Sequence, residues 1–320
     1  MSDERQHPDW SRRRFLATGV AASASALLGG TPFPAQGRVA ADGDAITRPI
    51  PSTGEPLPVI GLGTNAYGVS DPAEYAARKA VLARMPELGG SVVDTASAYG
   101  DSELVIGRAL AELGNRDRLF LATKTPIGGE VTGASDLVEV SFRRLQVGTI
   151  DLVQIHNLHG LDAFMPVLLE LKAAKRIRYV GMSTSRDDQY DGLVAALERY
   201  PVDFLQVDYS IGNRNAEERI LPFAHQQGLA VLVNMPFGGR RDRNLFPQVQ
   251  GRALPDWAAE VDVSSWAQFF LKYVVSHPAV TCAIPGTTKV AHLEDNQAAG
   301  RGRLPDADLR RRMEALWESV

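Results

Sequence analysis

The stretch Asp94-Thr95-Ala96-Ser97-Ala98-Tyr99-Gly100 places an acid and a phenol directly after a short apolar run. The apolar run predicts a buried strand, and a helical pattern begins at once behind Gly100. Residues 119–124 and 151–156 have the same form, because each apolar run ends in one titratable residue. Neighbouring parallel strands end at the same edge of their sheet, so the sequence predicts that four side chains meet there. These are Asp94, Tyr99, Lys124 and His156.

Strand-like and helical patterns alternate along the chain after residue 58. The expected strands are 59–64, 91–96, 119–124, 151–156, 177–183, 204–210, 229–235 and 281–286. The expected helices are 72–88, 103–113, 135–145, 162–174, 187–200, 216–227 and 264–276, with 293–299 and 306–317 closing the chain. Eight such repeats predict parallel strands with crossover helices, and hence an α/β fold of the (β/α)8 TIM-barrel type.

Three further segments refine this expectation. Residues 46–58 predict an N-terminal β-hairpin, with a turn at Ser52-Thr53-Gly54-Glu55. An open doubly wound sheet is the alternative fold, but Gly61-Leu62-Gly63-Thr64 lacks the third glycine of a dinucleotide-binding turn. The long segment 237–263 is expected to be a loop at the active end of the barrel, as a lid or cofactor flap.

The composition excludes several classes of protein. A net charge of −4 over 320 residues gives no electrostatic footprint for nucleic acid. The one cysteine, Cys282, lies in an apolar run and excludes an internal disulfide. His156 and His159 suggest a metal pair, but no third ligand has a suitable spacing, so no metal site is expected.

The first 41 residues differ in kind from the rest. Ser11-Arg12-Arg13-Arg14-Phe15-Leu16-Ala17 is followed by a mildly apolar stretch and by Val39-Ala40-Ala41, a candidate cleavage site. This pattern resembles a twin-arginine export signal, and the apolar stretch is too short for a stable membrane span. A disordered basic tail is the alternative. We therefore assign residues 1–41 to a signal and residues 42–320 to the barrel, and expect the twin-arginine translocase as a partner and a periplasmic or exported location.

The four converging side chains suit the protonation of an oxygen. An ammonium at Lys124 favours the ionised form of a neighbouring phenol, and Asp94 can hold that ammonium by an ion pair. Tyr99 then acts as a proton donor, while His156 donates a hydrogen bond to the same oxygen or relays the proton. Reduction of a carbonyl group needs such a donor together with a hydride, and the hydride must come from a cofactor.

The sequence strongly resembles the aldo-keto reductases from about Leu57 to Ala299. The motifs that carry the resemblance follow the family's order along the chain. They are Gly61-Leu62-Gly63-Thr64, the stretch 94–100, Ala122-Thr123-Lys124, Gln154-Ile155-His156, Gly181-Met182-Ser183 and Ile284-Pro285-Gly286-Thr287. The resemblance implies a (β/α)8 barrel and an NAD(P)H-dependent oxidoreductase that reduces an aldehyde or ketone to an alcohol. The family's catalytic Asp, Tyr, Lys and His fall on Asp94, Tyr99, Lys124 and His156.

The resemblance also implies where a nicotinamide cofactor and a small carbonyl substrate bind. The implied cofactor-binding residues are Gly63, Thr64, Asp94, Ser183, Thr184, Gln206, Asn234, Pro236, Ile284, Gly286, Thr287, Thr288, His292, Asp295 and Asn296. The implied substrate-binding residues are Asn65, Tyr67, Tyr99, His156 and Asn157. A buried glutamine on a strand needs a hydrogen-bond partner, which favours contact between Gln206 and a ligand.

Three departures from the family's pattern affect the cofactor site. Asn234 stands where the family usually stacks a tyrosine on the nicotinamide, and Thr184 stands where it usually has an asparagine. His292 stands where a basic residue usually meets the 2′-phosphate, with Lys289 or Arg240 able to compensate, so NADP(H) is favoured over NAD(H). Two alternative functions stay open: a nicotinamide-binding redox sensor or scaffold protein with little turnover, and a barrel lyase or isomerase that uses Lys124 as a Schiff base.

Overall fold

The computed structural model describes residues 43–239 and 243–320. The predicted export signal, together with Arg240 and Arg241, therefore lies outside the described residues. The described part contains an 8-stranded sheet in which neighbouring strands are parallel and follow the order of the chain. Its strands are β3 (Leu62–Gly63), β4 (Val92–Asp94), β5 (Phe120–Lys124), β6 (Ile150–His156), β7 (Ile177–Ser183), β8 (Phe204–Asp208), β9 (Ala230–Asn234) and β10 (Cys282–Ala283).

Two isolated bridges join the first strand of this sheet to the last. Ile60 pairs with Ala283, and Gly63 pairs with Gly286, both in parallel orientation. A β-carbon at Gly63 would lie 2.8 Å from the carbonyl oxygen of Ile284, so only glycine allows the two strands to approach at this point. The sheet thus closes on itself as predicted, and the (β/α)8 barrel is confirmed.

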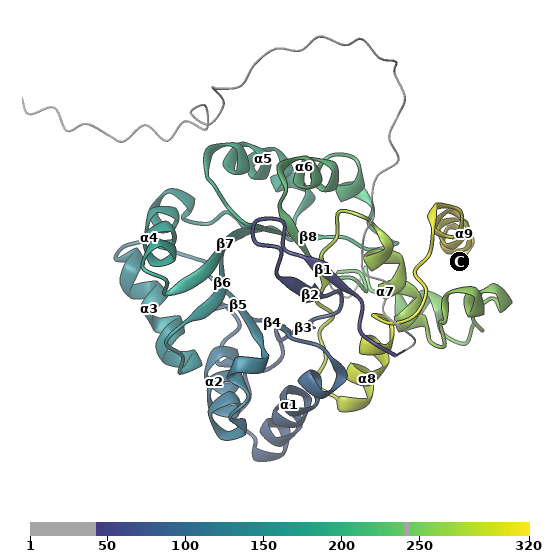
Figure 1. Ribbon diagram of the computed structural model, residues 1–320, viewed down its shortest axis with the longest axis horizontal. Coiled ribbons are helices and arrows are strands. Elements are labelled where there is room, and N and C mark those ends of the chain that lie inside the picture. The colour runs from purple at the N-terminus through teal and green to yellow at the C-terminus, as the bar shows by residue number, and fades with distance from the viewer. Residues whose placement is uncertain (1–42, 240–242) are drawn as a thin grey trace, which may run out of the picture. The chain divides into compact units, whose positions relative to one another are not determined.

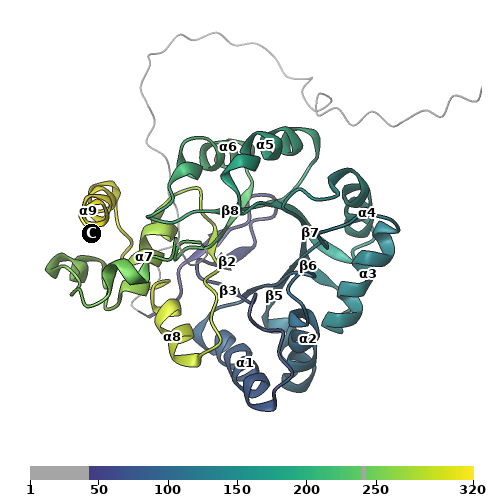
Figure 2. The ribbon, with the colours of Figure 1, turned by 180° about the vertical axis from the view of Figure 1, so that it is seen from behind.

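The helices surround the ring of strands, as Figure 1 and the opposite view in Figure 2 show. They are α1 (Pro72–Arg84), α2 (Ser102–Leu113), α3 (Ala134–Leu145), α4 (Leu161–Ala173), α5 (Tyr190–Arg199), α6 (Ile220–Gln227), α7 (Trp266–Ser276), α8 (Val290–Ala298) and α9 (Ala307–Glu318). The strands are buried on both faces, since every residue of β5, β6 and β8 is buried. This explains why the strands read as continuous apolar runs rather than as alternating patterns.

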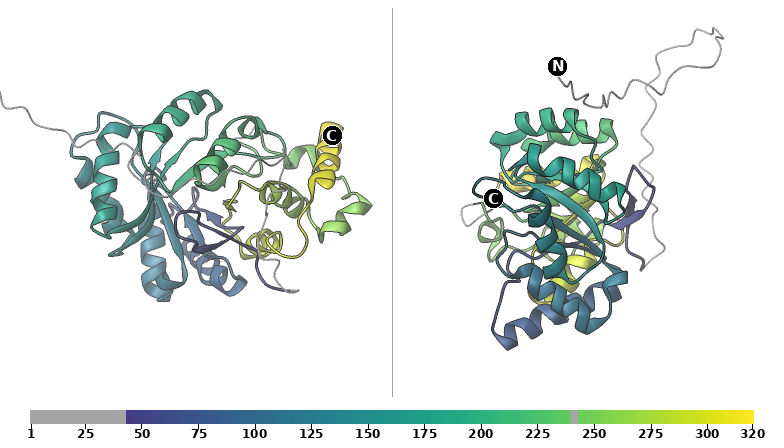
Figure 3. Two further views of the ribbon diagram at one scale, coloured as in Figure 1. Left: turned by 45° about the horizontal axis from the view of Figure 1, so that its top comes forward. Right: turned by 90° about the vertical axis from the view of Figure 1, so that its left-hand side faces the viewer.

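The predicted N-terminal hairpin is confirmed, and it closes one end of the barrel. Strands β1 (Thr47–Pro49) and β2 (Pro56–Pro58) pair antiparallel, and they lie across the ring of strands in Figure 1 and at one end of it in Figure 3. Ile50 and Leu57 belong to the same apolar cluster as interior residues such as Phe120 and Leu152. The hairpin therefore covers the amino-terminal end of the barrel, opposite the strand ends that carry Asp94, Lys124 and His156.

Several element boundaries differ from the prediction for local reasons. The first long helix changes at Met85 into the 3-10 helix η2 (Met85–Leu88), which contains Pro86 and ends at Gly89 with a φ of 80°. The predicted helix 187–200 begins as the 3-10 turn η4 (Asp187–Gln189), and the predicted helix 216–227 is preceded by η5 (Asn215–Glu217). Helix α3 begins at Ala134, one residue before the predicted start, and follows Gly133, which has a φ of 65° and provides no side-chain cap.

The predicted loop after β9 contains short helical turns. They are η6 (Phe246–Val249) and η7 (Asp256–Val261), with η3 (Arg116–Arg118) as a further short turn elsewhere in the chain. No helix within residues 43–239 and 243–320 is long and apolar enough to cross a membrane.

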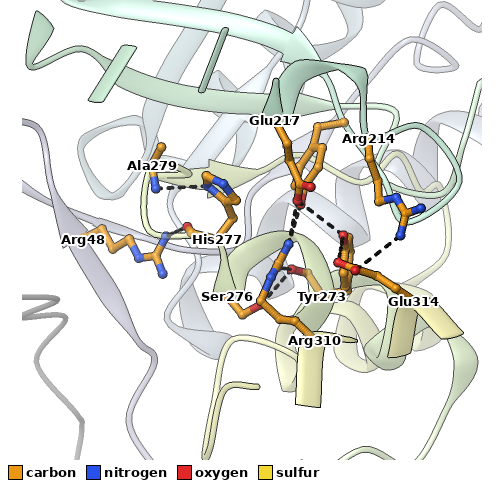
Figure 4. Close-up of polar contacts among 10 residues, drawn as sticks. Arg48, Arg214, Glu217, Tyr273, Ser276, His277, Ala279, Arg310 and Glu314 are labelled. Carbon is orange, nitrogen blue, oxygen red and sulfur yellow. Dashed lines mark hydrogen bonds and ion pairs between the residues drawn. The ribbon is translucent and has the colours of Figure 1, made fainter. Parts of the chain in front are cut away.

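Glu217 is the centre of a polar cluster that holds α9 against the barrel (Figure 4). Its carboxylate accepts a hydrogen bond from Tyr209 and another, at 3.3 Å, from Tyr273 of α7. Arg310 of α9 pairs with the same carboxylate at 2.7 Å, and its guanidinium lies 4.2 Å from the centre of the Tyr273 ring. Three side chains from three parts of the chain therefore contact one carboxylate, which fixes the last helix to the strand end of β8.

Candidate active site

Asp94 and Lys124 form a buried ion pair at the carboxyl-terminal ends of β4 and β5. The Nζ atom of Lys124 lies 2.5 Å from Oδ2 of Asp94, and it also donates to the carbonyl oxygen of Thr95 at 2.8 Å. The two side chains are only 2% and 3% exposed. Burial raises the pKa of the Asp94 carboxyl, while the ammonium of Lys124 opposes that rise. The predicted pairing of these two residues is confirmed.

Tyr99 and His156 lie beside this ion pair. The ammonium of Lys124 is 5.4 Å from the centre of the Tyr99 ring, and the Tyr99 and His156 rings meet edge to face with centres 6.0 Å apart. Tyr99 is half-buried in the turn between β4 and α2, whereas His156 ends β6 and is buried. The structure therefore brings together all four residues that the strand ends were predicted to deliver.

His156 is held as a neutral imidazole. Burial, and to a lesser degree the charge of Lys124, lower the pKa of His156 to about 3. Its backbone N–H donates to the hydroxyl of Thr125 at 3.1 Å, and its buried Nδ1 atom has no partner among the described residues. A neutral imidazole orients a ligand oxygen through a hydrogen bond, so Tyr99 remains as the group suited to give up a proton.

The turn after His156 is tightly constrained. Asn157 and Leu158 both have positive φ, at 50° and 59°, a conformation that non-glycine residues adopt rarely. The side-chain oxygen of Asn157 accepts a hydrogen bond from the backbone N–H of Ser185 at 3.1 Å, and its carbonyl oxygen accepts one from Gln189 at 3.1 Å. Asn157 was predicted to contact substrate, but the structure uses its side-chain oxygen to join the ends of β6 and β7.

The ends of β7, β8 and β9 form the side of the site where the resemblance places the nicotinamide. Ser183 donates to the carbonyl oxygen of Ile155 at 3.1 Å, and the hydroxyl of Thr184 lies 2.6 Å from Oε1 of Gln189. Thr184 is fully buried, and its hydroxyl is bonded within the protein. Asn234 donates to the carbonyl oxygen of Thr184 at 3.2 Å and keeps a buried Oδ1 atom without a partner among the described residues.

A hollow lies where the resemblance places the adenine-side phosphate and ribose. It has a volume of ≈ 290 Å³ and lies between the loop after β3 and the start of α8. Its lining residues are Gly63, Asn65, Ala66, Tyr67, Gly286, Thr287, Thr288, Lys289 and His292. The amino terminus of α8 has no side-chain cap, so its backbone N–H groups are available to an anion. Together with the exposed side chains of Lys289 and His292, these donors fit a dinucleotide phosphate.

Some of the predicted ligand residues instead brace the site. The ring of Tyr67 is fully buried and its hydroxyl donates to the carbonyl oxygen of Thr287 at 3.1 Å, so Tyr67 supports the loop before α8. Thr64 is also fully buried and donates to the carbonyl oxygen of Asp94 at 2.8 Å. Both carboxylate oxygens of Asp295 accept hydrogen bonds from the start of α7. One comes from the Ser265 hydroxyl at 2.8 Å and the other from the Gln268 amide at 2.7 Å.

The other predicted ligand residues divide by exposure. Asn65 and Gly286 are exposed, and Thr288 is partly exposed. Pro236, Ile284 and Asn296 are buried. The buried three shape the walls of the site, whereas the exposed residues can touch a cofactor or substrate directly.

Gln206 has partners within the protein. Its Oε1 atom accepts a hydrogen bond from Gln154 at 2.7 Å. The buried glutamine therefore has a partner within the protein, whereas the sequence favoured a ligand as that partner. Gln154 itself was missed as a site residue. The available signal was its spacing, because residues two apart on a strand face the same side and His156 follows Gln154 by two.

Across residues 43–239 and 243–320 there is no group of three or more His, Cys, Asp or Glu side chains that could hold a metal ion. Cys282 is fully buried, and burial raises the pKa of its thiol.

Comparisons with known proteins agree with this geometry. The sequence profile of the aldo/keto reductase family matches residues 59–318. The methylglyoxal reductase YeaE of Escherichia coli is 30% identical over 260 residues, which covers 79% of this chain and 89% of that protein. A probable aldo-keto reductase of Glycine max is 26% identical over 300 residues, covering 79% of this chain and 82% of that protein.

Solved structures show the same fold. An aldo/keto reductase from Klebsiella pneumoniae, crystallised with NADP and acetate, superimposes with a TM-score of 0.70 at 28% identity, and the match covers 82% of this chain and 93% of that one. The four converging residues and the closed barrel define a reductase that uses a nicotinamide cofactor. This chain belongs to the aldo/keto reductase family, whose members are NAD(P)H-dependent oxidoreductases that reduce carbonyl groups.

Proposed function

We propose that Tyr99 is the general acid of this NAD(P)H-dependent carbonyl reductase. The observation that carries the proposal is the Lys124 ammonium, which lies 2.5 Å from Asp94 and 5.4 Å from the centre of the Tyr99 ring. A positive charge fixed beside a phenol stabilises the phenolate that forms when the proton leaves. Asp94 holds that charge in place, since the ammonium is buried and has the Asp94 carboxylate and the Thr95 carbonyl as its acceptors.

Each side chain has one task in the reduction. When bound, NAD(P)H supplies a hydride to the carbonyl carbon of the substrate. Tyr99 transfers its proton to the carbonyl oxygen as negative charge develops there. His156 stays neutral and orients that oxygen through a hydrogen bond, and Lys124 stabilises the phenolate left on Tyr99. Asn234, Gly286 and the α8 amino terminus would hold the cofactor.

The experiment is a cofactor-consumption assay on purified protein. NADPH oxidation is followed with a panel of aldehydes and ketones, and the wild type is compared with Tyr99→Phe. We expect multiple turnovers by the wild type and a rate lower by about a hundredfold or more in the variant, because general acid catalysis contributes about 10²–10⁴-fold. Equal and negligible rates in both proteins would refute the assignment.

We propose small aldehydes, and 2-oxoaldehydes among them, as the substrate class. Support comes from the Escherichia coli relative, which is named for the reduction of methylglyoxal. Methylglyoxal is therefore compared with a bulky aromatic ketone at equal concentration. A higher kcat/KM for the aromatic ketone would exclude the proposed class.

We also propose NADP(H) as the preferred cofactor. Lys289 and His292 are exposed at the start of α8, where they can face a 2′-phosphate, and solved relatives from Klebsiella pneumoniae contain NADP or NADPH. Fluorescence titration should give a lower Kd for NADPH than for NADH, and Lys289→Ala should narrow the difference. An equal or lower Kd for NADH in the wild type would contradict this preference.

Export is a separate proposal that rests on the sequence of residues 1–41. Arg12 and Arg13 begin the pattern that resembles a twin-arginine signal, and a pathway that carries folded proteins suits an enzyme loaded with cofactor before export. Replacing both arginines with lysine should leave the protein in the cytoplasm of the producing cell. Unchanged secretion of the double variant would refute the signal.

A further inference from the structure

Gln154 crosses the interior of the barrel from β6 to two other strands. Its side chain is fully buried, and its Nε2 atom donates to Oε1 of Gln206 on β8 at 2.7 Å. The same nitrogen lies 3.4 Å from Oδ1 of Asp94 on β4. One amide group therefore contacts both the acid that holds Lys124 and the glutamine on the nicotinamide side.

The neighbouring strand leaves room for this side chain. Gly181 on β7 is paired in register with Gln154. A β-carbon at Gly181 would lie 2.9 Å from Cγ of Gln154 and 3.0 Å from the carbonyl oxygen of Phe204, so a larger residue would force the glutamine to move. The interior is thus shaped around a long polar residue, although an apolar side chain would fill the same layer of a barrel more simply.

The position of Asp94 depends on these contacts. Oδ2 of Asp94 accepts from Lys124, which leaves Oδ1 for Gln154, and the Gln206 amide also faces this carboxylate. A carboxylate with donors on both oxygens is fixed in rotation and in charge. If the Gln154 amide were absent, Asp94 could rotate, and the ammonium beside Tyr99 would lose its fixed position.

We propose that Gln154 is a positioning residue for carbonyl reduction, which couples Gln206, on the side where the resemblance places the cofactor, to the Asp94–Lys124 ion pair. The inference rests on the proposed function of Tyr99 and Lys124. Gln154 touches neither substrate nor the reacting atoms, so it acts through Asp94 on the charge beside the phenol and through Gln206 on the cofactor.

The test compares Gln154→Met with the wild type in kcat, in the KM for methylglyoxal and in the Kd for NADPH. Methionine has a similar length but no amide, so it removes both contacts with little change in volume. We expect kcat to fall by about ten- to a hundredfold, which corresponds to losing one buried hydrogen bond to a charged group. The Kd for NADPH should rise several-fold, and the KM for methylglyoxal should change less than kcat.

Gln297→Met is the matched control. Gln297 is 3% exposed on α8 and donates to the carbonyl oxygen of Ile60 at 3.2 Å, so its replacement removes a buried glutamine bond outside the site. This variant should lose stability while keeping the wild-type kcat and Kd. If both variants lowered kcat equally, the effect would be one of general stability, and the inference would be overturned.

Gln154→Glu gives a readout that a purely structural role would not move. A glutamic acid buried beside Asp94 has a raised pKa, because burial and a like charge both favour its neutral form. Below that pKa the neutral acid can still donate a hydrogen bond to Asp94, and above it the two carboxylates repel each other. We therefore expect this variant to approach wild-type kcat at pH 5 and to lose activity as the pH rises, with a steeper decline than the wild type.

The outcomes separate this inference from the proposed function. A wild type that reduces carbonyls while Gln154→Met and Gln154→Glu keep its kcat, Kd and pH profile would overturn the inference and leave the function intact. A wild type that reduces none of the carbonyls would overturn both. If Gln154→Met does not fold, the pH profile of Gln154→Glu decides, since its neutral form keeps the shape of glutamine.

Discussion

Replacing Lys124 with methionine should destabilise the protein strongly, because it leaves the Asp94 carboxylate buried without its cation. The two side chains are 2% and 3% exposed and lie 2.5 Å apart. Removing one partner of such a pair costs about 3–5 kcal/mol, since an uncompensated charge stays in a medium of low polarity. We expect Lys124→Met to lose about that much free energy of unfolding at pH 7.

The pH dependence of this variant follows from the same charge. Without Lys124, burial holds the pKa of Asp94 above its value in the unfolded chain, which is about 3.9. The folded state then binds more protons than the unfolded state between these two values, so stability falls as the pH rises through that window. The test is urea unfolding of Lys124→Met and of the wild type at pH 4.5 and at pH 7. The free energy of unfolding that the variant loses relative to the wild type should be smaller at pH 4.5 than at pH 7.

Two controls test the reasoning. Adding Asp94→Asn to Lys124→Met removes the stranded charge, so the double variant should recover most of the lost free energy at pH 7. Lys79 pairs with Glu112 at 2.6 Å, but those side chains are 32% and 35% exposed. Lys79→Met should cost less than about 1 kcal/mol. The reasoning fails if Lys124→Met and Lys79→Met lose equal stability, or if the double variant is no more stable than Lys124→Met alone.

Three more predictions follow from individual contacts. The pKa of His156 is lowered to about 3 by burial and by Lys124, so its ring proton signals in NMR should not titrate between pH 5 and pH 8; a midpoint near 6.5 would contradict this. Glu217→Gln removes the charge shared by two tyrosines and an arginine, and should lower the free energy of unfolding by about 2 kcal/mol and expose the last helix to proteolysis; wild-type resistance to proteolysis would refute this. Gly107→Ala places a β-carbon 2.2 Å from the carbonyl oxygen of Arg144, so α2 and α3 must move apart at a cost of about 1–3 kcal/mol or more; thermal unfolding at the wild-type temperature would contradict this.

Thr184 and Asn234 depart from the family's pattern, and the sequence revealed these departures but not the contacts that the two residues make. The sequence revealed that Thr184 lacks the usual amide and that Asn234 replaces a stacking ring. The structure adds that the Thr184 hydroxyl is held by Gln189 at 2.6 Å, while the Asn234 amide reaches over to the Thr184 carbonyl oxygen. An asparagine at the end of β9 thus brings an amide into the space next to Thr184, a position that spacing in the sequence does not show.

Two of the five residues predicted to contact substrate have polar side-chain atoms that are bonded within the protein. Tyr67 and Asn157 follow strand ends, and residues in such loops are expected to face the mouth of a barrel. The Tyr67 ring is buried and bonded to Thr287 in the loop before α8, and the Asn157 side chain accepts a hydrogen bond from Ser185 just after β7. The direction of a loop side chain depends on the backbone conformation, such as the positive φ of Asn157 and Leu158. No short-range pattern in the sequence predicts that conformation.

The sequence by itself determined the barrel, the hairpin and the meeting of Asp94, Tyr99, Lys124 and His156. These features depend on periodicity and on the common edge of parallel strands, so local patterns are enough to specify them. Only the tertiary structure showed that Gln154 bridges β4 and β8, and that Glu217 fixes α9 to the barrel. Such contacts join residues 50 or more positions apart, and their partners are selected by which side chains fit the closed interior rather than by spacing along the chain.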